Sequence, residues 1–233
     1  MTDARRPSRR GIIARALRWL VLAVVILIAG LILGLLAYRV LPVPSTLMLG
    51  RWLTLQPVER QWVPLTQISP ALVRAVIASE DQRFCSHAGV DWIELNAVLD
   101  DEDGPSRGAS TLTMQTAKNV FLWPGRSYLR KGLEIPLALA IDFAWPKPRI
   151  IEVYLNVAEW GDGIFGAEAA AQYYFKKPAA RLSGAEAARL AGALPNPILR
   201  NPARPSRALQ AAAGRVQRRV AQLGPLGDCA LPD

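Results

Sequence analysis

Two neighbouring acids at the end of a predicted helix are the first candidates for chemistry. Glu80 follows Val76 by four residues and Leu72 by eight, so its carboxylate extends the apolar side of that helix. A carboxylate at the end of a buried face is desolvated, which disfavours its charged form and suits it to general acid or base catalysis. The alternative is a frayed last turn with Glu80 and Asp81 in water. The pattern alone does not decide between the two.

A possible anion site lies in the segment 107–119. Gly108 precedes Ser110 and Thr111 at a predicted helix start, where free backbone N–H groups and hydroxyls can bind an anion. Lys118 follows on the same helix and could add positive charge. A capped helix with a solvated lysine fits this segment equally well.

A third cluster consists of two cations and an acid on one helix face. Glu134 follows Arg130 by four residues and Lys131 by three. Side chains at these spacings meet on the helix surface. The cluster is either an ordinary surface salt bridge or a second functional acid flanked by cations that bind phosphate.

The rest of the composition excludes much other chemistry. The 233 residues include two cysteines, Cys85 and Cys229, and one histidine, His87. They supply neither a zinc site of the Cys/His type nor a disulfide framework, and a Ser-His-Asp triad could use only His87. Carboxylates are therefore the expected catalytic groups. The sequence leaves open whether the cysteines pair, because a disulfide needs Cα atoms within about 7 Å of each other.

The formal charge of +9 is concentrated near the ends of the chain. Residues 1–39 hold seven arginines and one acid, whereas residues 40–199 hold 15 basic and 16 acidic side chains. A neutral central body argues against nucleic-acid binding.

The segment Trp19–Tyr38 predicts a membrane anchor. Its twenty residues carry no charge, and a helix of that length spans the hydrocarbon core of a bilayer. Six arginines precede it and only Arg39 follows closely, so the positive-inside rule places the N-terminus in the cytoplasm. A cleaved signal peptide is the alternative, but its apolar region is typically about 7–15 residues, and no Ala-x-Ala site follows closely.

The remaining elements are predicted to be almost entirely helical. No run alternates with the period of a strand, and Asp91–Glu94 and Ser183–Glu186 both have the form of a capping box. Ser110 and Ser127 are expected to cap helices over 111–122 and 128–143. Further helix starts are expected at Ser69-Pro70, Pro148, Ala167 and Ser206. The predicted organisation is a basic tail 1–18, an anchor 19–38, a membrane-proximal linker 39–59, a mainly α domain 60–223 and a tail 224–233.

Five ordered motifs resemble those of the peptidoglycan glycosyltransferases, the transglycosylase modules of glycosyltransferase family 51. The resemblance covers about residues 64–204. Met114 and the segment Asn156–Gly163 are similar to the monofunctional biosynthetic branch of that family. The motifs are Glu80–Gly89, Gly108–Gln115 with Lys118 and Asn119, Arg130–Glu134, Arg149–Asn156 with Gly161 and Gly166, and Ala187–Gly192 leading to Asn201 and Pro202.

The resemblance implies a lysozyme-like helical lobe beside a small membrane-proximal lobe. It implies an inverting transferase that polymerises lipid II into β-1,4 glycan and releases undecaprenyl diphosphate. In this reading Glu80 is the general base, Glu134 assists on the donor side, and a divalent cation, usually Mg²⁺, takes part with ligands that the sequence does not identify. The residues that would bind substrate are Asp81, Phe84, Gly108, Ser110, Thr111, Gln115, Lys118, Asn119, Arg130 and Lys131.

The same resemblance implies a place in the cell and a set of partners. The chain would be a single-pass protein of the inner membrane with its catalytic domain in the periplasm. Its partners would be lipid II, the growing lipid-linked glycan and the membrane, together with other proteins of cell-wall synthesis or division. Two alternative functions remain open at this stage: a lysozyme-like or lytic enzyme that cleaves cell wall, and a non-enzymatic anchored partner of a synthesis complex.

Overall fold

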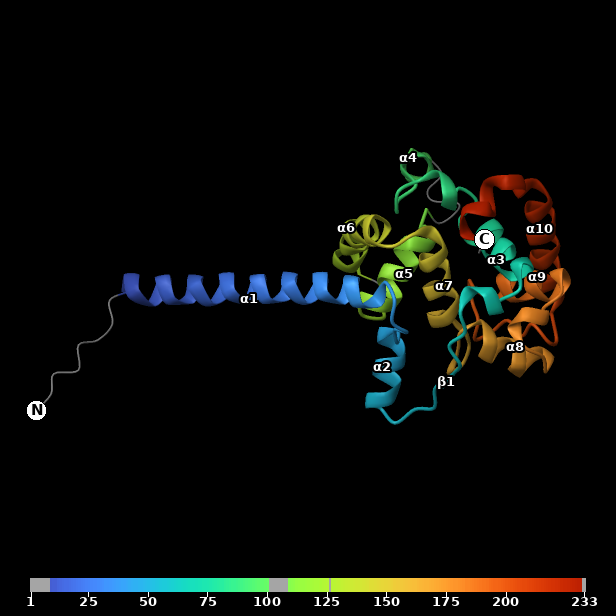
Figure 1. The fold of residues 1–233 in the computed structure, drawn as a ribbon, viewed down its shortest axis with the longest axis horizontal. Helices are drawn as coiled ribbons and strands as arrows, with labels where there is room; N and C mark the ends of the chain where they lie inside the picture. Colours follow the sequence, from blue (N-terminus) through green and yellow to red (C-terminus); the bar gives the residue numbers. More distant parts are fainter. Residues whose placement is uncertain (1–8, 101–108, 126, 232–233) are drawn as a thin grey trace, which may run out of the picture. The chain divides into compact units, whose positions relative to one another are not determined.

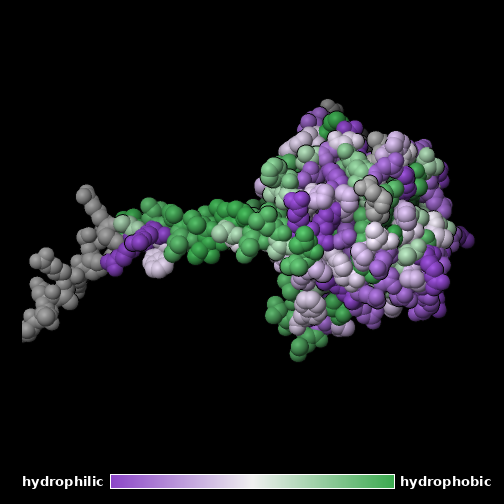
Figure 2. All heavy atoms as spheres, viewed as in Figure 1, coloured by the Kyte–Doolittle hydropathy of each residue, from purple (hydrophilic) through white to green (hydrophobic). Residues whose placement is uncertain are grey.

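The computed structural model describes residues 9–100, 109–125 and 127–231, which form two units. The first unit ends at Leu41 and consists of helix α1 (Arg9–Tyr38). Its segment Ile13–Tyr38 is long and apolar enough to cross a membrane, and it contains the predicted span. Apolar side chains cover this helix (Figure 2).

The second unit, Pro42–Asp233, is mainly helical, as predicted. Serine caps occur at Ser69, Ser127, Ser183 and Ser206, and the Ser183–Glu186 capping box is present. Its α-helices are α2 (Thr46–Leu53), α3 (Pro70–Glu80), α4 (Trp92–Leu99), α5 (Leu112–Phe121), α6 (Tyr128–Ala144), α7 (Lys147–Val157), α8 (Ala167–Phe175), α9 (Gly184–Ala193) and α10 (Arg207–Leu223) (Figure 1).

The cap of α5 differs from the prediction. The capping residue is Thr111, whose side chain accepts the backbone N–H of Met114, rather than Ser110. The Thr111 hydroxyl also donates to the carbonyl of Gly89 at 2.6 Å. This second bond joins the helix start to the preceding motif, a tertiary contact that the local sequence pattern does not reveal.

A small sheet was also missed by the sequence analysis. Its strands β1 (Glu59–Arg60), β2 (Glu159–Gly161) and β3 (Ile164–Phe165) lie in the order β1-β3-β2. β1 runs parallel to β3, and β2 runs antiparallel to it. Strands of two or three residues are too short to show a period of two, so no alternation signals them.

The expected linker 39–59 contains helix α2, which belongs to the compact unit. Met48 is fully buried, and the Thr46 hydroxyl donates to the carbonyl of Leu122 at 2.5 Å. Trp52, Leu53 and Leu55 remain exposed, so α2 presents an apolar face to its surroundings.

Helix α3 is a largely buried helix of the compact unit and carries Glu80 at its end. Leu72, Val73, Val76 and Ile77 of α3 are buried, and α9 and α10 pack against this helix. Helix α5 packs against α6 and α7 on the other side of the unit (Figure 1). Of the two alternatives left open for Glu80, the structure supports the end of a buried helix face.

A disulfide joins Cys85 to Cys229, with Cα atoms 5.8 Å apart. Cys85 lies in the short 3₁₀ segment η2 (Phe84–Ser86), directly after Glu80 and Asp81, and Cys229 lies in η4 (Gly224–Ala230). Arg74 of α3 reinforces the attachment, since it pairs with Asp228 and donates to the carbonyl of Gly224 at 3.0 Å. The C-terminal segment is thereby fastened to the turn that follows Glu80.

Loss of this disulfide is expected to destabilise the fold strongly. The cysteines are 144 residues apart, and a cross-link that closes such a long loop removes much entropy from the unfolded chain. Cys229→Ser should lower the free energy of unfolding by about 2–5 kcal/mol in chemical denaturation. Cys85→Ser and wild-type protein under reductant should show the same loss. Equal stability of oxidised and reduced protein would contradict the prediction.

Candidate active site

Glu80 is held at the end of α3 by two hydrogen bonds, one to each carboxylate oxygen. The Ser79 hydroxyl donates to Oε1 at 3.1 Å, and the Gln115 amide donates to Oε2 at 3.1 Å. Burial raises the pKa of Glu80, while these two bonds and the positive charge of Lys118 oppose the rise. The side chain is thus a desolvated carboxylate with a fixed orientation, the state that suits a general base.

Glu134 is the second acid, and it is almost fully buried between two cations. Its residue is 2% exposed. Arg130 pairs with Oε1, and the Lys131 ammonium lies 2.9 Å from Oε2. Lys131 also donates to the Ser110 hydroxyl at 3.2 Å, which connects α6 to the segment before α5. The Arg130–Glu134 pair is therefore a buried ion pair and not an ordinary surface salt bridge.

Lys118 links the surroundings of the two acids. Burial lowers the pKa of its ammonium, and the charge of Glu134 is the next largest influence. Arg130, Lys131 and Glu80 also act on this pKa through their charges. The hydrogen bonds show the same grouping: Gln115 of α5 bonds Glu80 at the end of α3, and Lys131 of α6 bonds both Glu134 and Ser110, just before α5.

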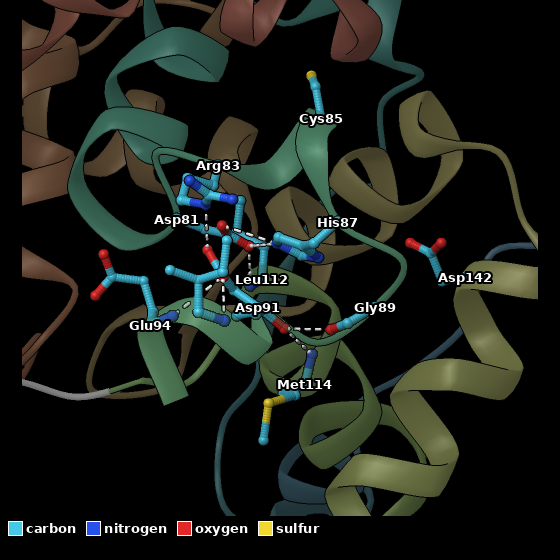
Figure 3. A network of polar contacts seen from close by, with 12 residues as sticks. Asp81, Arg83, Cys85, His87, Gly89, Asp91, Glu94, Leu112, Met114 and Asp142 are labelled. Carbon is cyan, nitrogen blue, oxygen red and sulfur yellow. Dashed lines mark hydrogen bonds and ion pairs between the residues drawn. The ribbon is translucent and has the colours of Figure 1, made fainter. Parts of the chain in front are cut away.

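Asp81 has a different environment from Glu80, although the two are adjacent. It is buried, and its oxygens accept hydrogen bonds from His87 Nε2 at 3.0 Å and from the backbone N–H of Leu112 at 2.9 Å. Figure 3 shows this network between the end of α3, the turn with His87 and the start of α5. Asp81 therefore fixes the turn after Glu80 against α5.

Gly89 completes this scaffold through a close approach of backbones. It has a φ of +79°, and a Cβ at this position would lie 2.5 Å from the carbonyl oxygen of Ala138 on α6. Lys147, at the start of α7, donates to the His87 carbonyl at 2.7 Å and lies 4.6 Å from the ring centroid of Phe84. Any side chain at position 89 would push α6 away from the turn.

The predicted site residues fall into two groups by the contacts that their side chains make. Asp81, Phe84 and Thr111 are buried in the scaffold, so we assign them to support of the site rather than to substrate contact. Gly108 lies outside the described residues. The backbone carbonyl of Asn119 accepts a hydrogen bond from Thr46 at 3.3 Å. The groups that come together around the two acids are Ser110, Gln115, Lys118, Arg130 and Lys131.

The fourth motif is mainly structural. Asn156 is fully buried, accepts the backbone N–H of Val63 at 3.0 Å and donates to the carbonyl of the same residue at 2.9 Å. Glu152 pairs with Arg149 and accepts the backbone N–H of Leu65 at 2.9 Å. These side chains fix the segment that contains Val63 and Leu65, which precedes α3. In the sequence, the signal for this role is that Glu152 and Asn156 are polar residues within an otherwise apolar helical segment.

Sequence reasoning missed Tyr154, which bonds Gln115 from the opposite side. Its hydroxyl donates to Gln115 Oε1 at 3.1 Å. Tyr154 falls within the fourth motif at a buried helical position, which suggests only packing. Its polar role depends on how α7 lies against α5 and is visible only in three dimensions.

Comparisons with known proteins identify the family of this chain. A family model described as Transglycosylase matches residues 48–222. A protein of Agrobacterium fabrum named biosynthetic peptidoglycan transglycosylase is 58% identical over 189 residues, which cover 80% of this chain and 84% of the relative. A protein of Brucella suis with the same name is 55% identical over 219 residues, which cover 93% of this chain and 97% of the relative. The chain belongs to the transglycosylase family.

Proposed function

We propose that this chain is a peptidoglycan glycosyltransferase that polymerises lipid II into β-1,4 glycan strands and releases undecaprenyl diphosphate. The observation that carries this proposal is the placement of both acids next to α5, where Glu80 bonds Gln115 and where Glu134 lies between Arg130 and a Lys131 that also bonds Ser110. The relatives named biosynthetic peptidoglycan transglycosylases support a polymerase over an enzyme that cleaves finished wall.

In the proposed step Glu80 takes the proton from the C4 hydroxyl of the acceptor sugar. The resulting oxygen attacks C1 of the terminal sugar of the growing chain from the face opposite the diphosphate. The C1–oxygen bond to the diphosphate breaks, and the leaving group keeps the electron pair, so the α linkage becomes β. The partly buried carboxylate of Glu80, oriented by two hydrogen bonds, suits the role of a general base.

The departing diphosphate needs fixed positive charge, and the cations near Glu134 can provide it. Arg130 pairs with Glu134, and Lys131 contacts both Glu134 and Ser110. The charges of both acids also act on the pKa of Lys118. Preorganised cations stabilise charge that develops during a reaction. We assign Glu134 to the orientation of these cations rather than to proton transfer.

The divalent cation that the family resemblance implies does not find a protein-made site in the described parts of the chain. These parts contain no group of three or more Asp, Glu, His or Cys side chains that could hold a metal ion. Both carboxylate oxygens of Glu134 form ion pairs with cations. The carboxylate of Asp81 accepts hydrogen bonds from His87 and from the backbone N–H of Leu112. We propose that a Mg²⁺ ion used here is held mainly by the substrate's diphosphate oxygens.

Several features support attachment to a membrane with the domain on the outer side. Helix α1 is able to anchor the chain, and the arginines before it favour a cytoplasmic N-terminus. The disulfide fits an oxidising compartment such as the periplasm. Exposed apolar side chains on α2 and α6, helices that both pack on α5, would contact the bilayer where the lipid-linked substrate resides: Leu49, Trp52, Leu53, Tyr128, Leu129 and Phe143.

The proposed function is tested by giving the purified full-length chain either labelled lipid II or finished glycan strands. Polymer should form from lipid II in the presence of penicillin, and finished strands should keep their length. Shortening of finished strands would instead identify a cell-wall-cleaving enzyme. Binding of lipid II without turnover would favour a non-enzymatic partner.

The rate of polymerisation should depend on pH through Glu80. A general base must be deprotonated, and burial raises the pKa of Glu80 above the ordinary value of 4.5, so activity should already fall as the pH drops towards that value from above. The check is the initial rate at saturating lipid II from neutral to mildly acidic pH. An acid limb centred below 4.5 would contradict the desolvated environment that we assign to Glu80.

A further inference from the structure

A chain of two hydrogen bonds connects a buried tyrosine on α7 to the carboxylate of Glu80 on α3. Tyr154 Oη donates to Gln115 Oε1 at 3.1 Å, and Gln115 Nε2 donates to Glu80 Oε2 at 3.1 Å. Tyr154 is only 2% exposed, so it is shielded from solvent. Three helices thus contribute one residue each to a relay that ends on the proposed base.

The orientation of the Gln115 amide decides whether this relay supports or opposes the charge on Glu80. One end of the amide is an acceptor and the other is a donor. If the amide turned over, its carbonyl oxygen would face the carboxylate, and the two negative groups would repel each other. A phenol that donates to Oε1 favours the orientation in which Nε2 faces Glu80.

Tyr154 is well suited to remain the donor. Burial, followed by the charge of Glu80, raises its pKa well above the ordinary value of 10.0, so the hydroxyl keeps its proton throughout the working range. The other charged groups that act on Glu80 are Lys118 of α5 and Asp81 at the end of α3. Tyr154 is the residue whose hydroxyl bonds Gln115 Oε1 and so orients the amide.

We propose that Tyr154 is a positioning residue for the polymerisation reaction, which acts by directing the amide N–H of Gln115 onto Glu80. This inference rests on the base role proposed above for Glu80. With Ser79 on Oε1 and Gln115 on Oε2, each carboxylate oxygen has one fixed hydrogen bond, which sets where its remaining lone pairs point. Tyr154 keeps the second of these bonds in place.

Removal of the Tyr154 hydroxyl should therefore affect the chemistry more than substrate binding. In Tyr154→Phe the Gln115 amide loses its anchor, and its bond to Glu80, which lowers the pKa of that carboxyl, becomes weaker. The kcat should fall by about 3- to 10-fold, the expected effect of one weakened hydrogen bond, with KM little changed. The acid limb of the pH profile should move to higher pH.

The test is a double-mutant cycle on the full-length chain with labelled lipid II as substrate. The variants are Tyr154→Phe, Gln115→Ala and the double variant, and the control is Tyr174→Phe, which removes another tyrosine hydroxyl that donates to the carbonyl of Trp160. The relay predicts that the double variant is no slower than Gln115→Ala alone. It also predicts that Tyr174→Phe leaves kcat and the acid limb unchanged.

Three outcomes would overturn the relay while the proposed function stands. These are a Tyr154→Phe enzyme with unchanged kcat and acid limb, losses that multiply in the double variant, and an equal shift in Tyr174→Phe. If Tyr154→Phe does not fold, Gln115→Met replaces it, and an unmoved acid limb in that variant overturns the relay. Failure of the wild-type chain to polymerise lipid II, or an active Glu80→Gln, would instead refute the proposed function.

Discussion

Glu80→Gln is expected to abolish polymerisation of lipid II while the protein stays folded. The amide cannot accept the proton of the attacking hydroxyl, and loss of a general base lowers rates by about 10²–10⁴-fold. The substitution keeps the size of the side chain and its place beside Ser79 and Gln115. Initial rates of polymer formation from labelled lipid II measure the effect.

The same variant should be at least as stable as the wild type at neutral pH. Because the pKa of Glu80 is raised in the folded state, the folded protein binds more protons than the unfolded chain between 4.5 and the raised pKa. The free energy of unfolding therefore falls as the pH rises from 4.5 to the raised pKa. A neutral amide at position 80 does not titrate, so the variant does not lose this stability. The thermal midpoint checks this, with Glu59→Gln, an exposed acid on β1, as the matched control for both assays. A folded and active Glu80→Gln would remove Glu80 from the base role.

Glu134→Gln is expected to cost both stability and activity. Arg130 and Glu134 form a buried pair, and removal of one partner from such a pair costs about 3–5 kcal/mol because a buried charge is left uncompensated. The amide keeps one acceptor oxygen and presents an NH2 donor to the other cation, so either Arg130 or Lys131 would lose the acceptor that orients it. Misplacement of groups by about 1 Å can lower rates by about 10²-fold, so polymerisation should fall by about that factor.

A second variant separates the two effects of Glu134→Gln. The Lys131 side chain is 46% exposed, so Lys131→Met should change stability by less than about 0.5 kcal/mol. If the cations beside Glu134 bind the diphosphate, this folded variant should still polymerise lipid II more slowly than the wild type. Unchanged rates in Lys131→Met, together with a Glu134→Gln variant that is fully active per folded molecule, would show that the cluster is only structural.

Much of the fold could be predicted because its signals are local. A serine directly before an apolar helical pattern marks a helix start, and Ser69, Ser127, Ser183 and Ser206 all cap helices as expected. The cap at Thr111 could not be predicted, because a contact with Gly89 from another segment selects it over Ser110. The short strands escaped prediction since each is held by its neighbours rather than by its own pattern.

The site was only partly predictable for the same reason. Helical spacing was sufficient to place Glu80 at the end of a buried face and Glu134 beside Arg130 and Lys131. Spacing could not show that Asp81 turns inward to His87 while the adjacent Glu80 bonds Gln115. The pairing of Cys85 with Cys229 was equally undetermined, because it depends on the return of the C-terminal segment to the turn after α3.

The most direct test of the central claim is the stoichiometry of the reaction with lipid II. The full-length chain should release one undecaprenyl diphosphate for each new β-1,4 bond, as expected when a sugar hydroxyl deprotonated by Glu80 displaces the diphosphate. Both quantities can be measured in one reaction from doubly labelled lipid II. A one-to-one ratio is the predicted result. Release of diphosphate without new glycosidic bonds, or glycosidic bonds of retained configuration, would contradict the account.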